Sequence, residues 1–210
     1  MAMRIDIWSD LVCPWCYIGK RRFEKALASF PQRDEVQVVH RAFQLDPTMP
    51  KGRLFKHRNV LMRKYGMSEP EVAAAQARLE RIAAEDGLEY HLAESRTGNT
   101  LDAHRLVHFA GKQGVQDAVV ERFFRAHFTE LRSLFDDESL IALAAEAGLE
   151  DASAVLKSER YAQEVAADHH QASALGANGV PFFVLDNRAS ISGAQATAVF
   201  TQALARLLVA

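Results

Sequence analysis

The chain has 210 residues, of which 49% are hydrophobic, and its formal net charge is −2. This length and this share of hydrophobic residues suffice for a buried core without disulfide staples, either as one domain or as a small domain with a large insertion. Acidic and basic residues are nearly balanced, which argues against a nucleic-acid or anionic-membrane surface.

The start of the chain lacks the features of a secretory signal. Asp6 and Asp10 interrupt its apolar residues, and no small-residue cleavage site follows. No window reaches the roughly 18 apolar residues of a membrane-spanning helix. We therefore expect a cytoplasmic protein without a membrane or nucleic-acid partner. In a reducing compartment, a cysteine pair is more often catalytic, redox-sensing or metal-bound than a structural disulfide.

The first 43 residues predict a strand, a helix and a second strand. Residues 4–8 alternate polar and apolar side chains, and residues 36–43 are rich in β-branched side chains. Between them, apolar residues recur at helical spacing until Pro31. This is the length of one β-α-β unit.

The composition then changes to a helical one. Residues 48–176 are dominated by Ala, Leu, Glu and Arg, and helix start and stop signals recur through them. Ser68 and Glu71 have the spacing of a capping box. Ser158 is predicted to cap the last helix of this block, which ends at Gly176.

Strand signals return after Gly176. Residues 182–185 and 189–192 predict two antiparallel strands joined by a short turn, and an amphipathic helix follows Gly193. The predicted order is therefore β-α-β, a helical block, and β-β-α.

This order predicts an α/β fold with two domains. Residues 1–47 and 177–210 form the first domain, and residues 48–176 form an all-helical insertion. No repeat, low-complexity tract or flexible linker separates the block from the rest of the chain.

The two cysteines of the chain lie together in Cys13-Pro14-Trp15-Cys16, between the first predicted strand and helix. The unpaired N–H groups and partial positive charge of a helix N-terminus favour a thiolate. We therefore predict that Cys13 is a nucleophile whose pKa lies below the ordinary value of about 8.5. Cys16, one turn further, is predicted to resolve a mixed disulfide. Pro14 suits the first turn, where its missing N–H would be unpaired.

Two other interpretations of the pair are a zinc half-site and two inert buried thiols. A structural zinc needs four ligands and the chain has no second cysteine pair, so we expect no metal. Asp10 lies three residues before Cys13 and is either a proton acceptor for Cys16 or a solvated residue at the strand end. Trp15, between the cysteines, is expected to be exposed and to contact substrate.

Several segments resemble the DsbA-type thioredoxin superfamily and, within it, the cytosolic FrnE-like branch. They are CPWCYIGK at 13–20, FQLDP at 43–47, NTLDAHR at 99–105, GVPFF at 179–183 and ISGAQ at 191–195. The resemblance implies a thioredoxin fold, thiol–disulfide chemistry at Cys13 and Cys16, and a cis Val180–Pro181 bond that faces them. The implied substrate-binding residues are Pro14, Trp15, Val180 and Pro181. Asn99 and His104 are implied to line a groove above the cysteines.

The chain departs from this family pattern in two places. Periplasmic members have His at the position of Trp15, where an imidazole stabilises the thiolate. We therefore expect no strongly oxidising potential, and a cytosolic glutathione poise of about −220 to −320 mV favours the dithiol. Some FrnE-like proteins have a second cysteine pair near the carboxyl end, which this chain lacks, so a function that needs that relay is excluded.

The expected function is a thiol–disulfide oxidoreductase of the reductase or isomerase type, acting on disulfides of proteins or small molecules. It needs no metal or organic cofactor, only glutathione or another thiol as co-substrate. One alternative is a glutathione-dependent enzyme of the kappa-transferase or 2-hydroxychromene-2-carboxylate isomerase type, in which Ser typically replaces Cys13. The other is a non-catalytic binding or chaperone module. Substrate, redox direction, a specific biosynthetic pathway and the choice between monomer and homodimer stay open.

Overall fold

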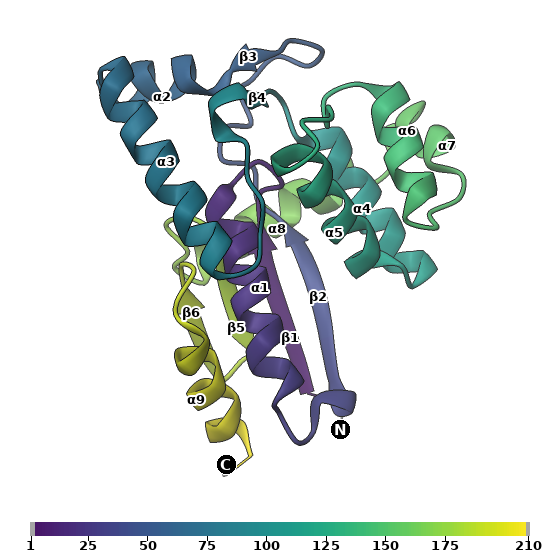
Figure 1. Ribbon diagram of the computed structural model, residues 1–210. Helices are drawn as coiled ribbons and strands as arrows, with labels where there is room; N and C mark the ends of the chain where they lie inside the picture. The colour runs from purple at the N-terminus through teal and green to yellow at the C-terminus, as the bar shows by residue number, and fades with distance from the viewer. Residues whose placement is uncertain (1–2, 209–210) are drawn as a thin grey trace. The chain divides into compact units, whose positions relative to one another are not determined.

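The computed structural model describes residues 3–208 and divides the chain into two compact units. The first unit joins the residues up to Leu45 to those from Gln163 onward, and the second comprises Asp46–Ala162. Figure 1 shows how the chain leaves the first unit in purple and returns to it in light green and yellow.

Within residues 3–208, the first unit contains a four-stranded sheet and three helices. Its strands are β1 (Met3–Ser9), β2 (Val36–Ala42), β5 (Phe182–Leu185) and β6 (Ala189–Ser192). Its helices are α1 (Pro14–Ala28), α8 (Ala162–Ala174) and α9 (Thr197–Leu207), with a 3-10 turn at Arg33–Glu35.

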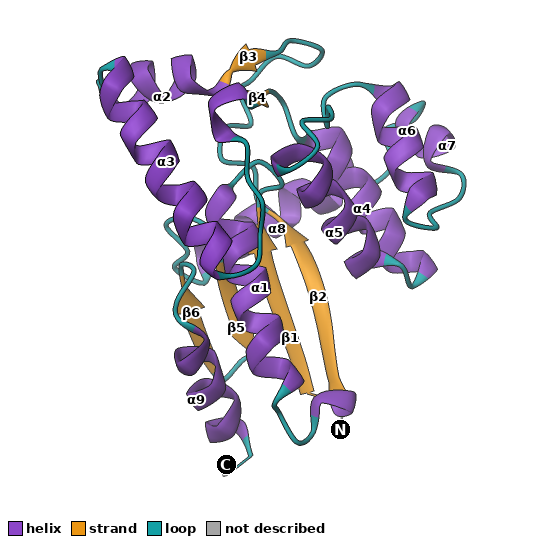
Figure 2. Cartoon of the chain, in the orientation of Figure 1, coloured by secondary structure: helices purple, strands orange, loops and turns teal. Residues whose placement is uncertain are grey.

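The sheet has the order β2-β1-β5-β6, drawn in orange in Figure 2. β1 is parallel to β2 and antiparallel to β5, and β6 is antiparallel to β5. The predicted β-α-β and β-β-α order is thereby confirmed. β1 is a central strand, so both of its edges are hydrogen-bonded.

Alternation along the strands creates two apolar faces. Ile5 and Ile7 pack in a core with Phe183 and with residues of α1 and α9. Trp8 and Phe182 point to the opposite face and pack with Ala172 of α8. The sheet therefore has α1 and α9 against one face and α8 against the other.

Asp168 fixes α8 to the sheet. This residue is buried, and its backbone oxygen accepts a hydrogen bond from the indole Nε1 of Trp8 at 2.9 Å. Its carboxylate accepts from Arg41 Nη1 at 3.0 Å and from the Ala42 backbone N–H at 2.9 Å. These contacts place α8 in the first unit. The chain therefore returns from the second unit to the first at Gln163, whereas the sequence predicted this return after residue 176.

The second unit is mostly helical, as predicted. Its helices are α2 (His57–Tyr65), α3 (Glu69–Glu85), α4 (Leu101–Gln113), α5 (Gln116–Phe128), α6 (Asp137–Glu146) and α7 (Ala152–Leu156), with a 3-10 turn at Leu92–Glu94. The prediction of an all-helical insertion is wrong in one detail, because β3 (Phe55–Lys56) and β4 (Arg96–Thr97) form an antiparallel pair. Strands of two residues are too short to produce an alternating pattern in sequence.

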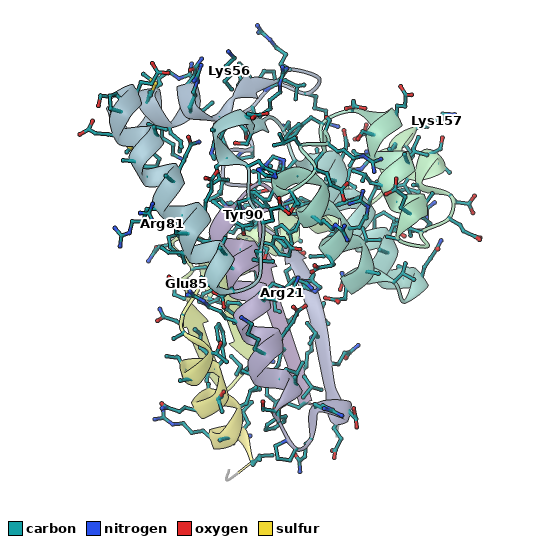
Figure 3. The ribbon with its side chains drawn as sticks, viewed as in Figure 1. Arg21, Lys56, Arg81, Glu85, Tyr90 and Lys157 are labelled. Carbon is teal, nitrogen blue, oxygen red and sulfur yellow. The ribbon has the colours of Figure 1, made fainter. Side chains whose placement is uncertain are left out.

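Side chains of the second unit are sorted between core and surface in the usual way. Tyr90 is buried and stacks on Phe128 with 4.7 Å between ring centroids. Lys56 and Lys157 are exposed (Figure 3). Within residues 3–208, no helix combines the length and the apolar character needed to cross a bilayer.

The capping box predicted at Ser68 and Glu71 is confirmed. Ser68 and Glu71 form the capping box of α3, and the Ser68 N–H donates to Glu71 Oε2 at 2.8 Å. The prediction for Ser158 is wrong, because its hydroxyl donates to Val155 O at the end of α7, and α8 begins only at Ala162.

The buried side chain of Arg105 explains this chain course. Its guanidinium donates to Val155 O at 2.6 Å and to Arg160 O at 2.8 Å, and it also bonds Ser158 O. These carbonyl groups therefore lie around one cation instead of continuing a helix.

His57 at the start of α2 is a half-buried neutral base. Its Nδ1 lies 3.4 Å from Ser95 Oγ, and that hydroxyl donates its own proton to Leu92 O at 2.7 Å. Nδ1–H is therefore the donor to Ser95. Burial lowers the pKa of His57 below its ordinary value of 6.5.

This shift predicts a pH-dependent stability. The unfolded chain protonates His57 near pH 6.5, whereas the folded chain resists protonation. The stability that depends on a neutral His57 is therefore complete above that pH and is lost as the pH falls. We expect the free energy of unfolding to fall by at most about 1.4 kcal/mol per pH unit from this group. Urea unfolding of wild type and His57→Asn at pH 7.5 and 5.5 measures it, since Asn keeps a donor but does not titrate. An equal pH slope in both proteins would contradict the assignment.

Candidate active site around Cys13 and Cys16

The cysteine pair lies at the start of α1, where the sequence predicts it. Cys13 is the N-cap residue, in extended conformation, and Pro14 begins the helix. The Cys16 N–H donates to Cys13 O at 2.9 Å, which closes the first turn. Both cysteines are free thiols. Cys13 is thus at the N-terminus of α1, an end of a helix that favours negative charge, although its side chain makes no cap hydrogen bond.

Cys16 lies deeper than Cys13. Cys13 is 5% exposed and Cys16 is 1% exposed. Burial raises the pKa of the Cys16 thiol well above its ordinary value, and the hydrogen bond and charge of Cys13 raise it further. The two thiols therefore have different environments, with Cys16 held in its protonated form.

A loop distant in sequence meets the cysteines. The Cys13 thiol donates to the backbone oxygen of Val180 at 3.7 Å. The bond between Val180 and Pro181 is cis, the conformation that the family resemblance implies. Pro181 is buried, and its oxygen accepts from the Gly193 N–H at 2.8 Å. The CPWC, GVPF and SGAQ segments are therefore neighbours in the first unit.

Asp10 is a buried residue beside the pair, not a solvated residue at the strand end. It is 1% exposed, and its Oδ2 accepts from the Leu45 N–H at 2.7 Å. Its backbone oxygen accepts from the Cys13 N–H at 3.0 Å. Asp10 acts on the pKa of Cys16 in two directions, since its backbone hydrogen bond lowers that pKa and its charge raises it. Asp10 is thus close enough to sense the charge of Cys16.

The remaining predicted residues fall in different places. Trp15 is 41% exposed, as expected, and its contact with substrate stays a prediction. In the second unit, the Asn99 amide donates to Met49 O at 2.6 Å, and His104 is buried on α4. Their predicted place along a groove stays a prediction. No cluster of three metal-ligating side chains occurs among residues 3–208.

Trp8 and Asp168 support the site and were missed in the sequence. The Trp8 ring packs against Phe182, the residue after Pro181, with 6.0 Å between centroids. Asp168 holds that indole from α8. No local signal links them, because Trp8 and Asp168 are 160 positions apart.

Comparison with known proteins identifies the family and the fold of this chain. Residues 4–205 match the family of DSBA-like thioredoxin domains. A probable DsbA oxidoreductase from Streptomyces coelicolor is 49% identical, with a TM-score of 0.94 over 99% of this chain and 90% of that one.

Two more distant structures share the fold alone. A 2-hydroxychromene-2-carboxylate isomerase is 19% identical, with a TM-score of 0.69 over 98% of this chain and 96% of its own. The cytosolic disulfide reductase DsbM from Pseudomonas aeruginosa is 19% identical, with a TM-score of 0.66 over 99% of this chain and 100% of its own, and it is also known with GSH.

The raised pKa of Cys16 predicts slow alkylation. In a Cys13→Ser variant, the rate of Cys16 alkylation by iodoacetamide should still increase with pH above 9, because burial opposes the thiolate. Mass spectrometry across pH 6–11 measures the rate. The same variant unfolded in urea is the control, since its thiol titrates near the ordinary value of about 8.5. Identical pH profiles for the folded and unfolded protein would refute the assignment.

Proposed function

Because this chain belongs to the DSBA-like thioredoxin domain family, we propose that it is a thiol–disulfide oxidoreductase acting through Cys13 and Cys16. One observation carries the proposal: two free thiols lie at the N-terminus of α1, with the Cys13 sulfur 3.7 Å from Val180 O. The helix N-terminus stabilises negative charge on an attacking sulfur. The neighbouring Val180–Pro181 segment offers backbone groups to a disulfide substrate.

The reaction proceeds by two exchanges. The Cys13 thiolate attacks one sulfur of the substrate disulfide, and the other sulfur leaves as a thiolate that takes up a proton. Cys16 then loses its proton and attacks the Cys13 sulfur, which releases the second substrate thiolate. The substrate gains two electrons and two protons, and Cys13 and Cys16 become a disulfide. Two equivalents of glutathione or another thiol restore the dithiol and become a disulfide themselves.

We propose that this cysteine pair reduces or isomerises disulfides and does not oxidise thiols, as in the cytosolic FrnE-like branch. Trp15 replaces the histidine that would stabilise the thiolate of a strong oxidant. The fold is shared with a cytosolic disulfide reductase that is known with GSH, which supports a glutathione-linked role in the cytoplasm. A reducing glutathione pool favours the dithiol form.

The cysteine pair favours thiol–disulfide exchange over the alternative of a glutathione-dependent kappa-transferase or 2-hydroxychromene-2-carboxylate isomerase. The fold is common to a 2-hydroxychromene-2-carboxylate isomerase, so the fold does not decide between them. Glutathione conjugation needs no second thiol, whereas here Cys16 is buried beside Cys13 at the position of a resolving thiol.

Serine substitutions separate the roles of the two cysteines. We expect Cys13→Ser to abolish glutathione-dependent reduction of a disulfide substrate, because the nucleophile is lost. Cys16→Ser should accumulate a mixed disulfide on Cys13 that mass spectrometry detects. Ser29→Ala, at the far end of α1, is the control and should keep full turnover. Undiminished turnover in Cys13→Ser would remove the proposal, and conjugation of a model electrophile by Cys16→Ser would favour the transferase alternative.

Asp10 is the proposed proton acceptor for Cys16. Its carboxylate is buried within the electrostatic range of that thiol, whose pKa is raised, so the second exchange needs a base at neutral pH.

The variant Asp10→Asn tests this role, since Asn can still accept from the Leu45 N–H. We expect release of the mixed disulfide at pH 7 to slow by about 10²-fold, with the loss decreasing at high pH. Stopped-flow measurement of the second exchange gives the rate. Asp34→Asn, at an exposed position, is the matched control. A loss that is equal at every pH would assign Asp10 a structural role only.

A further inference from the structure

Gly19 is a helical glycine that its backbone does not require. It lies inside α1, three residues after Cys16, and its φ is outside the left-handed region. Within a helix, glycine is less favourable than alanine. A glycine here therefore needs another reason, and its surroundings supply one.

A side chain at position 19 would meet rigid groups on three sides. A Cβ atom built there lies 2.8 Å from Pro181 Cγ, 3.4 Å from Phe183 Cζ and 3.5 Å from Ala194 Cα. The first distance is shorter than real Cβ contacts, and a proline ring cannot swing aside as a flexible side chain can. The Phe183 ring is fully buried in the core.

The neighbours of Gly19 are also held by hydrogen bonds. Arg22, on the next turn of α1, donates to Ala194 O at 2.8 Å. The Gly193 N–H donates to Pro181 O at 2.8 Å. Pro181 therefore meets the Gly19 position with its ring and is held to the Gly193 turn by its backbone oxygen, so a residue larger than glycine at position 19 requires a shift of this segment or of α1.

We propose that Gly19 is a positioning residue for the reaction. Its missing side chain lets Pro181 pack directly against α1, which places the Val180 oxygen 3.7 Å from the Cys13 sulfur. A Cβ at position 19 moves the Val180–Pro181 segment away from the dithiol and misplaces a substrate disulfide against Cys13. This inference rests on the proposed function, because it concerns the approach of a disulfide.

Gly19→Ala tests the proposal, with Gly111→Ala as the matched control. Gly111 is also a helical glycine, in α4, but its nearest neighbour is the flexible side chain of Gln116. Stopped flow gives the single-turnover rate of the reduced protein with Ellman's reagent, a small disulfide. We expect about a tenfold loss for Gly19→Ala, since small misplacements are costly, and less than about a twofold change for Gly111→Ala.

A second reagent separates positioning from general damage. Alkylation of Cys13 by iodoacetamide does not require a disulfide to be positioned beside the Val180–Pro181 segment. The alkylation rate should therefore change less than about twofold in Gly19→Ala. Equal losses with both reagents, or no loss with Ellman's reagent, would overturn the proposal.

A double-mutant cycle with Pro181→Ala locates the contact. Alanine lacks the Cγ atom that a Cβ at position 19 would meet, so Gly19→Ala should cost little in that background. If Gly19→Ala alone fails to fold, the double variant should fold again, as judged by thermal unfolding. An equal cost in both backgrounds, or no rescue of folding, would refute the role of Pro181.

These outcomes are distinguishable from failure of the proposed function. Glutathione-dependent turnover of wild type tests the function, whereas the ratio of single-turnover rates requires only a reactive Cys13. A wild type that does not turn over would remove the proposed function and leave the Gly19 comparison measurable.

Discussion

The antiparallel register between β1 and β5 is the constraint on which the candidate site depends. Trp8 near the end of β1 pairs with Phe182 at the start of β5. A short connection leads from β1 to Cys13, and Pro181 directly precedes β5. The antiparallel pairing therefore brings both residues to the same end of the sheet, where β1 ends and β5 begins. A register slip of one residue would turn Phe183 out of the core, which ties the geometry of the site to the packing of the sheet.

At this end of the sheet, burial and the start of α1 give two thiols of the same chemical type different tendencies to ionise. The N-terminus of α1 favours charge on the Cys13 sulfur, while burial keeps Cys16 protonated. Asp10 is buried with them and bonds the Leu45 N–H, so the segment after β2 is attached to the segment before α1. In the proposed function, Cys13 attacks, Cys16 resolves the mixed disulfide, and the buried carboxylate of Asp10 is the base for that second step.

The fold alone does not specify this chemistry. Structures at 19% identity with the same fold include both a disulfide reductase and a 2-hydroxychromene-2-carboxylate isomerase. The local features of the present chain are the second thiol at Cys16 and the close packing of Pro181 on Gly19. The fold brings residues from three distant segments together, and the chemistry depends on which side chains those segments supply.

Local pattern in the sequence determined the strands of the sheet, the start of α1 with its cysteine pair, and the capping box at Ser68, because periodicity and capping depend on neighbouring residues. Only the tertiary structure decided that α8 belongs with the sheet, that Ser158 ends a helix instead of starting one, and that Asp10 is buried. Each of these depends on a partner far along the chain, such as the carboxylate of Asp168 or the guanidinium of Arg105. A periodic pattern shows which face of an element is apolar, but it does not show which distant group will satisfy a buried charge or carbonyl.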